Sequence, residues 1–241
     1  MPRAGTEPGM SGILYIISAP SGSGKTTLVN ELRQYVIDLE FSISYTTRPP
    51  RGSEQDRREY RFIGREEFEE MVRREEFLEY AQVFGNYYGT ARGVLDRACE
   101  HGHDLLLDID VQGARQVKQK MPDAVSIFVL PPSRSELESR LRKRSQSENM
   151  QSEEVIRRRL ATARREIENY VNYDYILIND RLEQSVDRLQ AIVLGERIRR
   201  AGQPPSPEEK RFLETAEKCL KSRMEAEIKD ILGSFDDSSP T

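Results

Sequence analysis

Four short apolar runs divide most of the chain into strands that are separated by longer stretches with helical patterns. The runs cover residues 13–18, 104–109, 124–130 and 175–179. Parallel strands need long crossover connections, and strands buried on both faces are apolar along nearly their whole length. The pattern therefore predicts an α/β fold with a parallel sheet, whose ligand lies beyond the carboxyl ends of the strands.

The segment from residue 41 to about 92 has a different pattern, which indicates an inserted subdomain. Residues 41–46 alternate between apolar and polar side chains, as a half-exposed strand does. Residues 66–80 predict a helix with one apolar side. That side consists of Phe68, Met71, Val72, Phe77 and Leu78. Glycines at 52, 64, 85 and 89 interrupt the segment.

Residues 133 to about 165 predict helices rich in arginine, with acidic residues interleaved among the basic ones. Such alternation is typical of a solvated helical surface joined by salt bridges. For most of these arginines we favour that structural interpretation.

The C-terminal part of the chain predicts an amphipathic helix. Gly202 and two prolines end the preceding helix, and Ser206, Pro207 and Glu209 form the pattern of a capping box. The apolar stripe that follows comprises Leu213, Ala216, Leu220, Met224, Ile228 and Ile231. The stripe packs either on the core or on another subunit, and both possibilities stay open. Residues 235–241 are expected to be disordered and residues 1–10 to form a flexible leader.

Composition narrows the possible functions. The 241 residues include 37 basic and 41 acidic side chains, and the resulting net charge of −4 argues against general binding to nucleic acids or membrane surfaces. No apolar run approaches the length of about 18 residues that a membrane span needs. The first eleven residues contain no apolar signal core. We therefore expect a cytoplasmic protein.

The cysteines and histidines are few. Cys99 and Cys219 lie too far apart in sequence to indicate a disulfide framework or a zinc motif. Cys99, His101 and His103 cluster and could suggest a metal, but we favour a helix end and turn before the next strand. With only two histidines, a Ser/His/Asp hydrolase is not expected.

A phosphate-binding loop is the clearest chemical motif in the sequence. Residues 19–26 join the first apolar run to a helical segment in the order that such a loop requires. Its backbone N–H groups and the helix N-terminus can bind an anion, Lys25 can reach outer phosphates, and the Thr26 hydroxyl can ligate Mg²⁺. The residues expected to bind the phosphate chain of a nucleotide here, which the resemblance described below identifies as ATP, are Ala19, Pro20, Ser21, Gly22, Ser23, Gly24, Lys25, Thr26 and Thr27. Ala19 stands where the strict pattern has glycine.

Two further signals concern arginines and carboxylates. Arg48 and Arg51 lie on a proline-stiffened segment and can converge on one anion, since a guanidinium binds phosphate through two hydrogen bonds. An ordinary surface turn with exposed arginines is the alternative. Asp108 and Asp110 follow a buried strand, where they would face the phosphate loop and could serve Mg²⁺ or a substrate base. Residues 79–90 could be no more than a helix end followed by an aromatic-rich turn.

Together these motifs resemble the guanylate kinase family. In order, the resemblance covers residues 19–27, 44–54, 59–60, 79–90, 107–113 and 173–180, within about residues 12–200. It implies transfer of the γ-phosphoryl group of ATP to GMP with Mg²⁺. The implied fold has a core (11–43, 92–132 and 166–200), a GMP-binding subdomain (44–91), a helical lid (133–165) and an additional C-terminal extension (201–241).

The resemblance also implies roles for individual residues. The residues matched to GMP binding are Ser44, Arg48, Arg51, Glu54, Tyr60, Glu79, Tyr88, Gly89, Thr90, Asp108 and Asp110. Asn179 matches a residue near the ATP adenine. The catalytic set implied by the family comprises Lys25, Arg48, Asp108, Arg144 and Arg159. Thr26 would ligate Mg²⁺, with Asp108 acting through water.

Two points stay open at the level of sequence. The segment after Arg144 is longer than the family's usual pattern and lacks its glycine, so Arg142 is the alternative lid arginine. The alternative functions are a phosphopeptide-binding module without catalysis and a kinase for another phosphorylated acceptor. The intact Gly24, Lys25 and Thr26 favour an enzyme.

Overall fold

The central sheet of the computed structural model has five strands that are all parallel, in the order β2-β7-β1-β8-β9. The structure describes residues 12–236 except 53, 84 and 148–152, and the side chains of 144–147 are also not described. The predicted runs are confirmed as β1 (Leu14–Ser18), β7 (Asp104–Asp108), β8 (Val125–Leu130) and β9 (Tyr175–Ile178). The sequence did not reveal the edge strand β2 (Leu39–Phe41) as part of this sheet.

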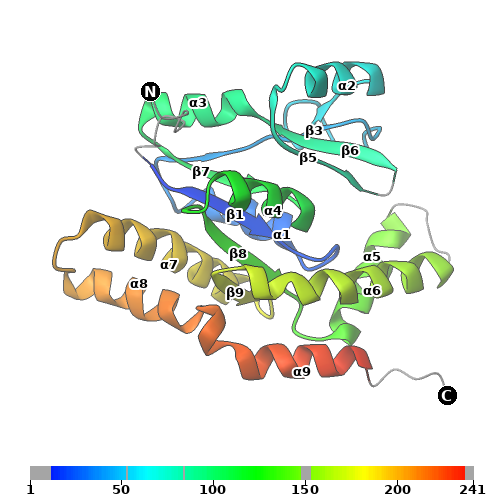
Figure 1. Ribbon diagram of the computed structural model, residues 1–241. Coiled ribbons are helices and arrows are strands. Elements are labelled where there is room, and N and C mark those ends of the chain that lie inside the picture. Colours follow the sequence, from blue (N-terminus) through cyan, green and yellow to red (C-terminus); the bar gives the residue numbers. More distant parts are fainter. Residues whose placement is uncertain (1–11, 53, 84, 148–152, 237–241) are drawn as a thin grey trace.

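Helices cover both faces of the sheet, which explains why its strands are apolar throughout (Figure 1). Along β1, Tyr15 and Ile17 pack toward α1 (Lys25–Leu32) and α7 (Leu182–Ala201). The alternate residues Leu14 and Ile16 pack toward α3 (Arg92–His101) and α4 (Val111–Lys120). All four side chains are at most 4% exposed, as a strand between two helical layers requires.

A second sheet, in the order β4-β3-β6-β5, lies to one side of the core (Figure 1). It consists of β3 (Tyr45–Thr46), β4 (Arg61–Phe62), β5 (Phe77–Val83) and β6 (Asn86–Ala91). The prediction of one strand over 41–46 is wrong, because the chain passes from one sheet to the other within it. Ser42 N still bonds to Leu106 O of the core, whereas Tyr45 pairs with Gly89 of the second sheet.

The helix predicted over residues 66–80 is too long. Helix α2 (Arg65–Arg73) ends before Glu75, which has a left-handed φ of 54°. Phe77 therefore starts strand β5, and its ring stacks on Phe68 of α2 at 4.4 Å between centroids. Of the apolar side chains predicted to share one helix face, Phe68 and Phe77 meet across a turn between a helix and a strand, whereas Leu78 joins the apolar cluster of the core.

Two helices, α5 (Arg134–Ser147) and α6 (Glu153–Ile167), lie below the second sheet at the right of Figure 1. A small apolar cluster holds them together. It contains Leu137, Leu141, Ile156, Leu160 and Ala163. A short 3-10 helix, η1 (Glu168–Asn172), leads from α6 back to strand β9.

The C-terminal extension forms two helices rather than one. The capping box of α8 (Pro207–Lys218) is present, since Ser206 and Glu209 bond to each other's backbone N–H groups. The chain leaves this helix where Cys219 O accepts from Ile176 N at 2.8 Å, on the free edge of β9. After η2 (Lys221–Arg223), α9 (Glu225–Asp236) begins. The expectation of disorder is therefore wrong for Phe235 and Asp236, and residues 237–241 lie outside the described residues.

The apolar stripe of the extension packs on the chain's own core. Ala216, Ile228 and Ile231 are at most 3% exposed. Helix α9 also reaches α5 and α6, where Ser234 Oγ accepts from Arg134 N at 3.1 Å and Asp236 pairs with Arg164 at 2.6 Å. The extension therefore joins the core to the two basic helices.

Replacing Ile231 by alanine should lower the free energy of unfolding by about 2–4 kcal/mol, since it removes buried methylenes and leaves a cavity. Lys229→Ala, on the exposed side of the same helix, is the matched control and should change it by less than about 0.5 kcal/mol. Urea unfolding of both variants measures the difference. If Ile231→Ala had the same free energy of unfolding as Lys229→Ala, α9 would not pack on the core.

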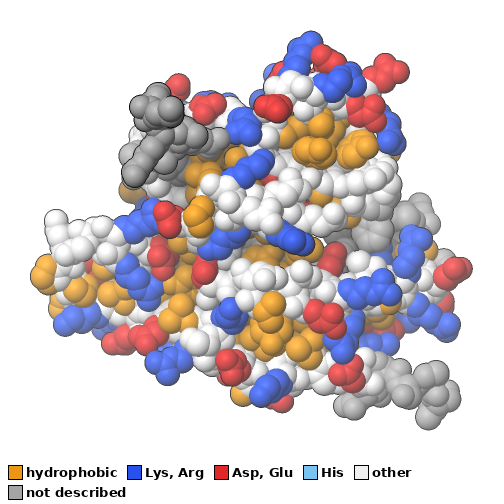
Figure 2. Space-filling model, in the orientation of Figure 1, with side chains coloured by type: hydrophobic (Ala, Val, Ile, Leu, Met, Phe, Trp, Pro, Cys, Tyr) orange, Lys and Arg blue, Asp and Glu red, His pale blue; other side chains and the backbone are white. Residues whose placement is uncertain are grey.

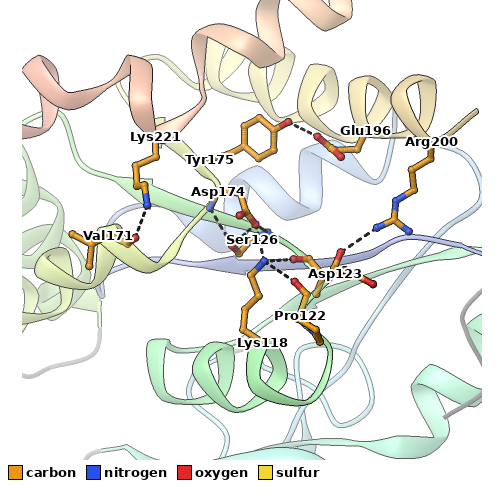
Figure 3. Close-up of polar contacts among 11 residues, drawn as sticks. Lys118, Pro122, Asp123, Ser126, Val171, Asp174, Tyr175, Glu196, Arg200 and Lys221 are labelled. Atoms are coloured by element: carbon orange, nitrogen blue, oxygen red, sulfur yellow. Dashed lines mark hydrogen bonds and ion pairs between the residues drawn. The ribbon is translucent and has the colours of Figure 1, made fainter. Parts of the chain in front are cut away.

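Both signs of charge are interspersed over the face seen in Figure 2, in keeping with the balanced composition. Within the described part of the chain, no helix combines the length and apolar character needed to cross a membrane.

Candidate active site

A cleft of about 1100 Å³ opens at the carboxyl ends of the core strands. The phosphate loop, the second sheet and the basic helices all contribute to its walls. The lining residues that sequence reasoning singled out are Ala19, Pro20, Ser21, Gly22, Ser23, Gly24, Lys25, Thr26, Thr27, Ser44, Arg48, Arg51, Glu54, Tyr60, Glu79, Tyr88, Asp108, Asp110 and Arg159. Gly89, Thr90 and Asn179 are not among the lining residues.

The phosphate loop turns tightly between β1 and α1. Gly22 and Gly24 have φ angles of 94° and 88°, which side chains with a Cβ rarely adopt. A Cβ on Gly24 would also collide with the amide of Asn179. Gly24 is the N-cap of α1, so the positive end of this helix faces the cleft at the loop. This arrangement suits a phosphate group.

Asn179 supports this loop from behind. It follows β9, is 6% exposed, and its Nδ2 donates to Ser23 O at 2.7 Å. Arg140 of α5 extends the contact, because its guanidinium donates to Ser23 O at 3.3 Å and to Asn179 O at 3.0 Å. Asn179, predicted to bind ATP, therefore contacts the loop rather than the cleft.

Lys25 and Asp108 meet at the wall of the cleft, where the Lys25 ammonium forms an ion pair with the Asp108 carboxylate. Burial lowers the pKa of Lys25 to about 8, although Asp110, Glu166 and Glu79 oppose this shift. Thr26, the next residue in α1, lines the same space. A hydroxyl and a carboxylate are hard oxygen ligands, so these residues fit the coordination that Mg²⁺ prefers.

Arg48 is held in place by several partners. It is 5% exposed, pairs with Glu54 at 2.9 Å, and donates from Nε to Tyr88 OH at 3.2 Å. Although burial raises the pKa of Glu54, hydrogen bonds from Arg48 and from Arg51 N keep it below its ordinary value. The alternative of an ordinary surface turn is therefore wrong for Arg48. Glu54, expected to bind substrate, holds this arginine in position.

Glu79 is a carboxylate buried in the wall formed by the second sheet. It is 3% exposed, and burial raises its pKa to about 7, with Asp110 adding to the rise and Thr90 opposing it. It also lies against Gly113, where any Cβ would collide with its carboxylate. A buried acceptor of this kind is suited to a ligand that presents N–H donors.

The residues near Glu79 divide into two groups. Ser44 and Asp110 line the cleft, and Asp110 is also the N-cap of α4, since its Oδ1 accepts from Gly113 N at 2.8 Å. Thr90 and Gly89 are buried in β6 behind the wall. This capping function of Asp110 was not predicted, although Asp before a helical segment is a common N-cap signal.

The basic helices contribute Arg140, Arg158, Arg159 and Glu166 to the cleft. Burial raises the pKa of Glu166 to about 7 and Asp110 adds to the rise, while a hydrogen bond from the Ser21 backbone N–H and the charge of Lys25 oppose it. Arg140, Arg158 and Glu166 were not predicted as site residues, because many charged residues on these helices share the same sequence pattern. The side chain of Arg144 lies outside the described residues.

Arg142, the alternative to Arg144, does not line the cleft. Its guanidinium pairs with Glu138 at 2.7 Å and with Glu153 of α6. Arg142 therefore joins α5 and α6 to each other.

Comparisons with known proteins agree on one family. The family model for guanylate kinase matches residues 11–196. A guanylate kinase of Koribacter versatilis is 57% identical over 230 residues, which cover 95% of this chain and 98% of the relative. One of Escherichia coli K12 is 48% identical over 194 residues, covering 80% of this chain and 92% of that protein.

A solved structure agrees with these sequences. The crystal structure of guanylate kinase from Anaplasma phagocytophilum matches with a TM-score of 0.64 and 35% identity, over 77% of this chain and 86% of that one. The predicted α/β phosphate-loop kinase fold is thereby confirmed. This chain belongs to the guanylate kinase family.

Proposed function

We propose that this chain phosphorylates GMP to GDP with ATP and Mg²⁺, as an enzyme of purine nucleotide metabolism that recycles GMP. One observation carries the proposal. A single cleft connects the phosphate loop to Arg48 and to the buried carboxylate of Glu79. It therefore offers one place for a phosphate chain and another for a phosphorylated guanine nucleotide.

On the ATP side, the loop from Ala19 to Gly24 surrounds the phosphates, and Lys25 neutralises their outer charge. Thr26 would hold Mg²⁺, with Asp108 acting through water. The ion, when bound, neutralises charge on the phosphates. Asn179 and Arg140 keep the loop in its binding conformation through their bonds to Ser23 O.

On the GMP side, the phosphate binds to a set of cleft residues held near Arg48. This set is Arg48, Arg51, Tyr60 and Tyr88. Glu79 and Asp110 accept hydrogen bonds from the N1–H and N2–H₂ groups of guanine, and Ser44 donates to its O6. Adenine lacks this pair of donors and would leave the Glu79 carboxylate unsatisfied, so the site rejects AMP.

The reaction needs no strong base, because the attacking phosphate oxygen of GMP is already ionised at neutral pH. Catalysis consists of aligning two anions and neutralising their repulsion with Lys25, Mg²⁺ and the arginines. We assign GMP binding to residues 44–91 and the lid to residues 133–165. Closure of both parts would exclude water, which limits hydrolysis of ATP.

Arg159→Ala should lower kcat about 100- to 1000-fold with a smaller change in either KM, since its charge acts mainly on the transferring phosphoryl group. Arg142→Ala is the matched control on the same lid. Because Arg142 pairs with Glu138 and Glu153 outside the cleft, its loss should change kcat less than about tenfold. Steady-state rates of ADP formation measure both. The reverse ranking would identify Arg142 as the lid arginine that contacts phosphate.

The deciding experiment offers GMP, AMP, UMP and dTMP separately with ATP and Mg²⁺, and measures ADP formation. Turnover with GMP alone would support the proposal. Preference for another acceptor would assign a different kinase activity, and absence of any turnover would favour the phosphopeptide-binding module.

We also propose that the enzyme is cytoplasmic. Sedimentation of the full chain distinguishes a monomer from a homo-oligomer.

A further inference from the structure

Both histidines of the chain lie together at the end of the core sheet opposite the cleft. His101 is the last residue of α3, and His103 precedes β7 by one residue. Gly102 between them has a left-handed φ of 69°, so the chain turns sharply there. The sequence-based expectation of a helix end before a strand is therefore correct. The turn also brings the two rings to 5.4 Å between centroids.

A carboxylate from another element completes the cluster. Glu40 of β2 places its Oε1 at 2.6 Å from Nδ1 of His101 and at 3.3 Å from Nδ1 of His103. One ligand atom from each residue lies within 4.8 Å of the other two. Ligands bound to Zn²⁺ at about 2.0–2.2 Å in a tetrahedral site lie roughly 3.5 Å apart, so small side-chain movements would bring all three onto one ion.

The surroundings favour a cation. Asp38 Oδ1 lies 3.6 Å from Nε2 of His103, the ring nitrogen that points away from Glu40. A metal-bound histidine commonly donates its other N–H to a carboxylate, which fixes the ring and raises its basicity. The nearby Arg197 forms its ion pair with the buried Asp104 at 2.7 Å and donates to the backbone oxygen of Asp38 at 3.2 Å, so its contact with Asp38 is not with the carboxylate that lies near His103.

Cys99, which lies near the histidines in sequence, is not part of this cluster. Its side chain packs against the apolar cluster between the sheet and helices α3 and α4. The ligand set is therefore two imidazoles and one carboxylate, and sequence spacing alone could not reveal the carboxylate because Glu40 lies sixty-one residues away from His101.

We propose that Glu40, His101 and His103 form a binding site for one divalent transition-metal ion of the zinc type, with Asp38 as the outer carboxylate. Two imidazole nitrogens favour Zn²⁺, Ni²⁺ or Cu²⁺ over Mg²⁺, which prefers oxygen ligands in octahedral geometry. Water completes the coordination. None of the three ligands lines the catalytic cleft, so the ion would join the edge strand β2 to the turn between α3 and β7 without entering the reaction.

Titration calorimetry tests the site with untagged, metal-stripped full-length protein and ZnCl₂, in the presence of millimolar MgCl₂. We expect one Zn²⁺ per chain. The double variant His101→Asn/His103→Asn should bind Zn²⁺ at least about 100-fold more weakly, and Asp38→Asn about 10-fold more weakly. Cys99→Ser is the matched control and should bind as the parent does. Saturating Zn²⁺ should raise the Tm of the parent by about 5 °C, and that of the double variant by much less.

Two results would overturn the proposal. The first is a parent protein that shows no saturable binding of one Zn²⁺. The second is equal affinity in the parent and the double variant, which would place the ion elsewhere. GMP kinase activity of the double variant should equal that of the parent, so it confirms that the variant folds. If the cluster is only a hydrogen-bonded group, the first result is the one expected.

Discussion

Lys25→Ala is expected to abolish phosphoryl transfer, with a loss of at least about 1000-fold in kcat, while the fold survives. Lys25 is the first residue of α1 and its ammonium reaches the carboxylate of Asp108 in the cleft. Charge developing on the transferring phosphoryl group is stabilised most by fixed charges inside a site that excludes water, and alanine removes such a charge. Single-turnover formation of GDP measures the loss.

The matched control is Lys210→Ala, which removes an exposed lysine from α8 on another part of the molecule. It should keep parental activity. The Tm of Lys25→Ala should fall by no more than a few degrees. The aliphatic stem of Lys25 lies at the wall of the cleft and belongs to neither of the apolar clusters on the two faces of the central sheet. A folded Lys25→Ala protein with parental kcat would exclude the proposed mechanism.

The core could be predicted from sequence because strands buried between two helical layers leave an unambiguous apolar run. The strand β1 shows this, since alternate side chains enter different apolar clusters and none faces water. Half-exposed segments carry less information. Residues 41–46 do alternate in burial, but alternation does not say which sheet a strand joins. The break after α8 depends on pairing with β9, some forty residues away.

The residues of the site also differ in how far the sequence predicts them. Lys25 and Asp108 could be predicted because Lys25 lies in the loop and helix that follow β1, Asp108 ends β7, and the carboxyl ends of parallel strands meet at one edge. Arg140 and Glu166 could not, since they lie on helices where arginine and glutamate are frequent and only packing selects the few that face the cleft. Asn179 was predicted to bind ATP, and its amide donates to Ser23 O of the phosphate loop, a contact that the sequence did not reveal.

Glu79→Gln should raise the KM for GMP about 100-fold or more and lower kcat much less. The carboxylate offers acceptors to two guanine donors, whereas the amide presents an N–H₂ group to one of them and leaves a buried donor unsatisfied. Glu76→Gln, which changes an exposed glutamate three residues earlier in the chain, is the matched control and should keep the parental KM. An unchanged KM in Glu79→Gln would remove Glu79 from the guanine site.

The pH dependence of GMP binding gives a second test of Glu79. Burial raises its pKa to about 7, so the ionised acceptor is present above that pH and is lost below it. The KM of the parent for GMP should therefore rise as the pH falls from 8 to 6. The GMP phosphate also titrates in this range, but it does so equally for both proteins. The ratio of KM values between Glu79→Gln and the parent should consequently shrink toward low pH.

Protein stability should change in the opposite direction from substrate binding. The unfolded chain releases the Glu79 proton near pH 4.5 and the folded chain near pH 7, so the folded state binds more protons between these values. Stability contributed by the protonated carboxyl is present below pH 4.5 and is lost as the pH rises to 7, by up to about 3 kcal/mol. Glu79→Gln lacks this loss. Urea unfolding should therefore show that Glu79→Gln is about 1–3 kcal/mol more stable than the parent at pH 8. At pH 4.5 the two proteins should have nearly equal free energies of unfolding. This result would mean that guanine recognition is maintained at the expense of stability.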